Sequence, residues 1–154
     1  MDKCLVLLLV LILVFSLLLS GCTTNEADIT SLSFFDEIKV NPEMYNGQTV
    51  TFTGYWFDGF EIVVVAEYLE PQQYWPGNYQ PGGILIWVQG GLPDEVSSKL
   101  YLQADNPTGY PAHYGKVEVT GILEYGGPFG HMNAYQYQLQ IQSARWIDWT
   151  PSND

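Results

Sequence analysis

The chain has 154 residues, of which 47% are hydrophobic and 14% are charged, so it is long enough for one domain and too apolar to be intrinsically disordered. Seventeen acidic and five basic residues give a formal net charge of −12, which excludes the basic surface that binding to nucleic acid or to an anionic membrane requires. Fifteen glycines, nine prolines and 15% aromatic residues are typical of short strands joined by many turns, and they argue against a helical bundle.

The start of the chain predicts export from the cytoplasm. Lys3 precedes an apolar run over residues 4–19, and small residues follow this run before Cys22, as in a signal peptide. Residues 19–22, Leu-Ser-Gly-Cys, resemble the lipobox of bacterial and archaeal lipoproteins. That resemblance implies cleavage before Cys22 and lipidation of this cysteine, which would anchor the domain in the cell membrane. The alternative is an uncleaved anchor, because about twenty apolar residues span a bilayer; both interpretations place the domain outside the cytoplasm.

Residues 31–40 predict a short amphipathic helix. Leu32, Phe35 and Ile38 recur at helical spacing, and serines at the start of the segment can cap the first turn. Pro42 disfavours helix at the residue before it, so we expect the helix to end there.

The body of the chain predicts five strands and one further helix. Asp58 and Gly59 are typical of a hairpin turn between the first two strands, and Pro93 followed by acidic residues predicts a helix over 93–101. Residues 68–83 are interpreted as a long insertion before the third strand. The predicted strands, from their alternating or continuous apolar residues, are 48–57, 60–66, 84–89, 116–125 and 135–144.

This order of elements predicts the fold and the domain boundaries. Three strands, a helix and two more strands is the order of the OB-fold, so we expect an all-β domain with one or two short helices, built as a five-stranded OB-like Greek-key barrel. The alternative is an open β-sandwich. The expected divisions are a signal peptide at 1–21, a lipidated cysteine and tether at 22–28, the barrel domain at 29–150 and a C-terminal tail at 151–154.

Three motifs together resemble a family of exported OB-fold-like proteins. They are the Asn-Pro-x-x-Tyr-x-Gly pattern at residues 41–47, Gly54 at the end of the first strand, and Gly-His-Met at residues 130–132. The resemblance covers most of the chain after residue 22 and implies the barrel fold. Proteins of this family are functionally uncharacterised, so it implies no reaction.

The sequence gives little support to catalysis. The only histidines are His113 and His131, no Gly-x-Ser-x-Gly elbow is present, and the cysteines and histidines have no metal-ligand spacing. The adjacent acid pairs at 36–37 and 94–95 point in different directions on a helix and cannot share one proton. We therefore expect a protein without enzymatic activity, cofactor or metal; an enzyme would need His131 close to a carboxylate in a cleft.

Aromatic residues give the best indication of a binding surface. Trp87 should lie on the outer face of the third strand, beside an aromatic insertion and the loop before the fifth strand, and such rings can stack on a ligand. The alternative is that the insertion folds back and that Tyr74 and Trp75 cover Trp87. For His131 we favour a role as a loop staple, bonded to a backbone carbonyl, with Met132 filling the barrel end. The candidate binding residues are Trp87, Tyr74, Trp75, Tyr79, His131 and Phe129.

We therefore predict a lipid-anchored, extracytoplasmic OB-like binding module. The expected ligand is a protein partner in the cell envelope, and the alternative is an oligosaccharide bound by exposed aromatic residues. Nucleic acid is excluded by the charge, and an enzyme is the third and weakest hypothesis.

Overall fold

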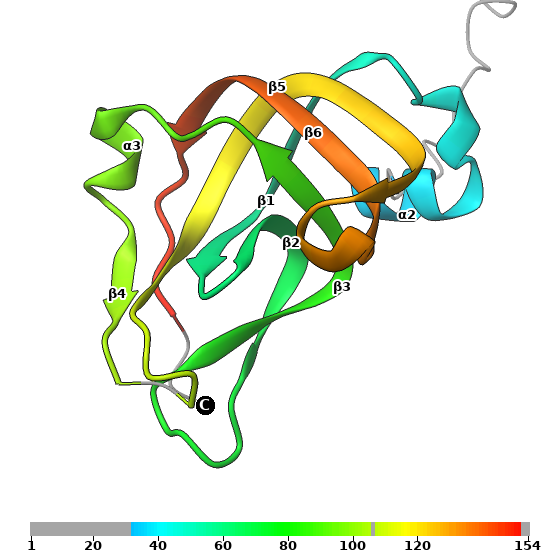
Figure 1. Cartoon of the computed structure of the whole chain (residues 1–154). Helices are drawn as coiled ribbons and strands as arrows, with labels where there is room; N and C mark the ends of the chain where they lie inside the picture. Colours follow the sequence, from blue (N-terminus) through cyan, green and yellow to red (C-terminus); the bar gives the residue numbers. More distant parts are fainter. Residues whose placement is uncertain (1–31, 106, 152–154) are drawn as a thin grey trace, which may run out of the picture. The chain divides into compact units, whose positions relative to one another are not determined.

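The structure, a computed structural model, describes residues 32–105 and 107–151 (Figure 1). The predicted signal peptide and tether at 1–28 lie outside these residues, as does the tail beyond Pro151. Within the described part, no helix has the length and apolar character needed to cross a membrane. The helices are α2 (Phe34–Val40), η1 (Pro42–Met44), α3 (Asp94–Ser97) and η2 (His131–Asn133). The strands are β1 (Thr49–Gly59), β2 (Ile62–Pro71), β3 (Tyr79–Gln89), β4 (Tyr101–Gln103), β5 (Ala112–Phe129) and β6 (Tyr135–Trp146).

The strands form an OB-like barrel, as predicted. The sheet has the order β1-β2-β3-β6-β5-β4, and an additional pairing of β1 with β5 joins its two sides into a partly closed ring. Neighbouring strands are antiparallel except for β3 and β6, which run parallel. The open sandwich is therefore wrong. The five predicted strands correspond to β1, β2, β3, β5 and β6, and β4 is an additional three-residue strand on β5.

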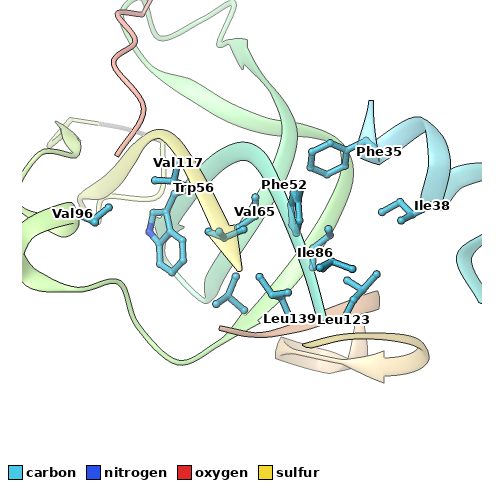
Figure 2. Close-up of a cluster of buried hydrophobic side chains, with 13 residues drawn as sticks. Phe35, Ile38, Phe52, Trp56, Val65, Ile86, Val96, Val117, Leu123 and Leu139 are labelled. Atoms are coloured by element: carbon cyan, nitrogen blue, oxygen red, sulfur yellow. The ribbon is translucent and has the colours of Figure 1, made fainter. Parts of the chain in front are cut away.

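The core follows from the alternation along the strands. Val50, Phe52 and Trp56 of β1 are buried, while threonines lie between them at the surface. Figure 2 shows the side chains of Phe52 and Trp56 converging with those of the other strands inside the barrel. The buried members of this core are Phe35, Ile38, Val50, Phe52, Trp56, Val65, Ile86, Val88, Val96, Val117, Val119, Leu123 and Leu139.

The two α-helices lie at opposite ends of the barrel (Figures 1 and 2). In α2, the Ser33 hydroxyl accepts a bond from the Asp36 N–H (3.2 Å), and the Asp36 carboxylate accepts one from the Ser33 N–H (3.3 Å), which forms a capping box. Phe35 and Ile38 of this helix are buried in the core, and α3 contributes Val96. The helix predicted over 31–40 is thus confirmed, whereas the one predicted over 93–101 has only four residues.

Residues 68–83 do not form an insertion, contrary to the prediction. β2 continues to Pro71 and β3 begins at Tyr79, so the two strands extend beyond the barrel as a hairpin arm (residues 67–83) with its turn at 72–78 (Figure 1). Prolines and glycines in these segments conceal the strand pattern. Gly82 lies directly against the Tyr68 ring, which a Cβ atom at this position would overlap.

The first hairpin also turns later than predicted. Gly59 still pairs with Ile62, so the turn is formed by Phe60 and Glu61 and not by Asp58 and Gly59. Glu61 has a φ of 58°, a left-handed conformation that few residues other than glycine adopt. Asp58 therefore remains within β1, where its side chain is half-buried.

Candidate functional site

The predicted binding residues do not meet on one surface. Tyr74 and Trp75 lie in the turn of the arm and are exposed, with 83% and 43% of their surface accessible. Tyr79 is buried, with only 4% accessible. Trp87 and Phe129 are half-buried on the barrel, and His131 is exposed in η2.

Tyr79 was predicted to be part of an accessible aromatic surface, and this is wrong. The Tyr79 N–H donates to Oε1 of Gln103 (3.0 Å), and Nε2 of Gln103 donates to the Tyr79 carbonyl (3.1 Å). The tyrosine ring packs on Tyr114 with 5.2 Å between ring centroids. The Gln103 side chain of β4 thus makes the two backbone hydrogen bonds that a neighbouring strand would make. It attaches the arm to the outer face of the barrel.

The idea that residues 68–83 fold back is therefore correct only in part. Tyr79, which directly follows the turn, and Leu69 pack on the barrel, while Tyr74 and Trp75 in the turn stay exposed. A second aromatic cluster forms beneath it, outside the barrel core. Its buried members are Phe57, Val64, Tyr79, Ala112 and Tyr114.

Trp87 lies on the outer face of β3, as expected, but it is covered. Its ring lies 5.1 Å from that of Tyr135, and a Cβ atom at Gly130 would come within 2.5 Å of the indole. The loop before β6 therefore passes directly over Trp87. Phe129, the last residue of β5, pairs with Tyr135, the first residue of β6, so the two flank this loop. These residues form a packed unit and no open stacking platform.

His131 holds the loop, although not through a backbone carbonyl. Its Nε2 lies 3.1 Å from the Glu61 carboxylate, and both side chains are exposed. This contact joins the loop before β6 to the β1–β2 turn. Met132, expected to fill the barrel end, has 84% of its surface accessible. Neither His131 nor Glu61 lines either of the two hollows described below.

A hollow of about 460 Å³ lies at the turn of the arm, and we call it the tip hollow. Nε2 of Gln72 donates to the Tyr79 carbonyl (3.2 Å), and Nε2 of Gln80 donates to the Glu70 carboxylate (3.2 Å), so both amides are held in place. No lining residue carries a charge. The lining residues are Gln72, Gln73, Tyr74, Trp75, Gln80 and Pro107.

A larger hollow of about 620 Å³ lies beside α3, and we call it the α3 cleft. Asp58 of β1 and His113 of β5 are cross-strand neighbours on its wall. Burial raises the pKa of the Asp58 carboxyl above its ordinary value, and the nearby His113 acts in the opposite direction. The lining residues are Trp56, Asp58, Val63, Gly90, Gly91, Leu92, Asp94, Ser97, Ser98, Leu100 and His113.

Sequence reasoning missed the α3 cleft for a specific reason. Asp58 was assigned to a turn, and the 93–101 helix was expected to be longer, so nothing placed the two segments around one hollow. Across residues 32–105 and 107–151, no group of three or more His, Cys, Asp or Glu side chains is arranged to hold a metal ion. Comparison of the chain with protein-family models, curated proteins and solved structures gave no match.

Proposed function

We propose that the chain is a lipid-anchored, non-enzymatic binding module that works outside the cytoplasm and binds an oligosaccharide in its tip hollow. The observation that carries this proposal is the combination of two exposed aromatic rings, Tyr74 and Trp75, with three neutral amide side chains around one open hollow. The apolar run at residues 4–19 and the lipobox-like residues 19–22 support the location.

The chemistry of the tip hollow matches a sugar better than a protein surface. A sugar ring has an apolar C–H face that can pack on an aromatic ring, and hydroxyl groups around its edge that both donate and accept hydrogen bonds. The amides of Gln72, Gln73 and Gln80 offer both donors and acceptors, and they carry no charge that would select an ionic partner. We therefore place the oligosaccharide ahead of the protein partner that the sequence favoured.

The anchoring part of the proposal is tested by replacing the lipobox cysteine. We expect Cys22→Ser to abolish labelling of the protein with radioactive fatty acid, because no thiol would remain at the lipobox to carry the lipid. Cys4→Ser is the matched control, since this cysteine lies within the predicted signal peptide and its replacement should leave labelling unchanged. Continued labelling of the Cys22→Ser protein would contradict lipidation at this cysteine.

The binding part is tested with the full chain on an array of neutral and acidic oligosaccharides, followed by titration of the best neutral one. Trp75→Ala should weaken binding roughly tenfold or more, because stacking on an aromatic ring contributes about 1–3 kcal/mol. The free energy of unfolding should change by less than about 0.5 kcal/mol, since the ring is exposed.

The control for this titration is Met44→Ala, which removes an exposed apolar side chain from η1, away from the arm. It should leave sugar binding unchanged. If no oligosaccharide binds, or if both variants bind equally well, the sugar assignment is wrong. A purified envelope protein whose binding depends on Trp75 would then identify a protein partner instead.

A further inference from the structure

The α3 cleft is separate from the tip hollow, with which it shares no lining residue. Its walls come from the end of β1, the start of β2, the segment joining β3 to α3, the helix itself and β5. It therefore lies at the α3 end of the barrel, which Figure 1 shows opposite α2. Nothing in the proposed sugar binding uses this cleft.

The floor of the α3 cleft is apolar. Trp56, with 3% of its surface accessible, belongs to the barrel core, and Val63, Leu92 and Leu100 pack against that core while remaining partly accessible. Figure 2 shows the Trp56 indole at the end of the core nearest Val96 of α3. Such a floor suits a short apolar chain, which would gain about 25 cal/mol for each Å² of surface removed from water.

Two carboxylates line the cleft, beside the polar side chains of Ser97, Ser98 and His113. Asp58 and Asp94 both line it, and no lysine or arginine does. Asp58 is half-buried, and its carboxylate makes no hydrogen bond or ion pair with the described residues; its titratable neighbour is His113 across the strand. Removing a carboxylate partly from water costs free energy unless a cation or a hydrogen-bond donor lies next to it.

We propose that the α3 cleft binds an alkyl cation, with an ammonium or guanidinium group beside Asp58 and Asp94 and an apolar stem on Trp56, Leu92 and Leu100. The charge of −12 favours the approach of cations over anions. A free alkylamine and the side chain of a lysine or arginine share this chemistry. An apolar stem that ends in a strongly hydrated cation suits a floor of this kind with acidic groups at its margin.

The test is titration of the isotope-labelled full chain in detergent with n-butylammonium, observed through the NMR signals of Trp56 and Val96. We expect saturable shifts of both signals, and n-butanol, a neutral molecule of similar size, should give none. Asp58→Asn should weaken binding roughly tenfold or more, because a charge-assisted hydrogen bond is lost. Glu95→Gln is the matched control, because Glu95 belongs to α3 but does not line the cleft.

Asp58→Asn should fold, because burial already disfavours the charged form of Asp58. Asp94→Asn gives a second, independent test at an exposed position. Tighter binding of a capped lysine peptide than of n-butylammonium would assign the cation to a protein side chain, and the reverse would assign it to a free amine. The proposal is overturned if no shift saturates, if n-butanol binds equally well, or if neither aspartate variant weakens binding.

Discussion

Replacement of Trp87 by alanine is expected to lower the free energy of unfolding by about 3 kcal/mol, the lower end of the range for a tryptophan removed from a packed site. The indole is half-buried between the Tyr135 ring, 5.1 Å away, and the backbone at Gly130. Its removal would leave a cavity under the loop before β6. Urea unfolding followed by circular dichroism measures the loss without depending on tryptophan fluorescence.

Trp75→Ala is the matched control for this experiment. The same side chain is removed, but from the exposed turn of the arm, so we expect a change below about 0.5 kcal/mol. The two variants thus distinguish a packing role from a binding role: Trp87→Ala should lower the free energy of unfolding, and Trp75→Ala should weaken ligand binding. If Trp87→Ala proved as stable as Trp75→Ala, the loop would not cover the indole, and Trp87 would again be a candidate for a stacking platform.

The barrel could be predicted because its signals are local. Strict alternation of apolar and polar residues in β1 and β6 fixes which face of each strand is buried, and the order of strands and helix then restricts the topology to few choices. β4 escaped prediction because three residues carry no periodicity. It also lies at Tyr101–Gln103, where the early proline and acidic residues had predicted a helix end.

The candidate sites could be predicted much less well, because they depend on contacts between distant residues. Tyr79 is buried through Gln103, a residue 24 positions later in the sequence. Trp87 is covered because Gly130 has φ 68° and ψ −164°, a conformation open essentially to glycine alone, which lets the backbone lie on the indole. The sequence contained both glycine and tryptophan, but it offered no signal that they meet.

The geometry of the tip hollow depends on how the arm is held in place. An isolated two-stranded hairpin is at best marginally stable in water, so an arm that extends beyond the barrel needs additional contacts near its turn to hold the turn in place. The Gln103 amide provides these contacts at Tyr79, and the amide of Asn78 donates to the carbonyl of Asp105 beside it. Ligand binding at Tyr74 and Trp75 should therefore depend on residues that the ligand does not touch.

Gln103→Leu is the direct test of that dependence. Leucine has a similar size but can neither accept from the Tyr79 N–H nor donate to its carbonyl, and both groups are buried. We expect the free energy of unfolding to fall by about 2 kcal/mol, because each buried backbone group left without its partner costs roughly 1–3 kcal/mol and the carbonyl keeps its bond from Gln72. Urea unfolding measures this loss.

The same variant should also loosen the arm itself. This local effect would show that Gln103 holds the arm in place and is not simply a buried glutamine that adds to overall stability. Hydrogen exchange at the Tyr79 amide should accelerate more than exchange at Val119 in the barrel core, because the arm can open without unfolding the barrel. Gln142→Leu, on the exposed face of β6, is the control and should change neither quantity.

Sugar affinity should fall in Gln103→Leu although Gln103 lies outside the tip hollow, since a detached arm no longer holds Trp75 and the surrounding amides in one geometry. Unchanged exchange at Tyr79 would show that the arm is held by its own strand pairing, and the tip hollow would then be independent of the barrel.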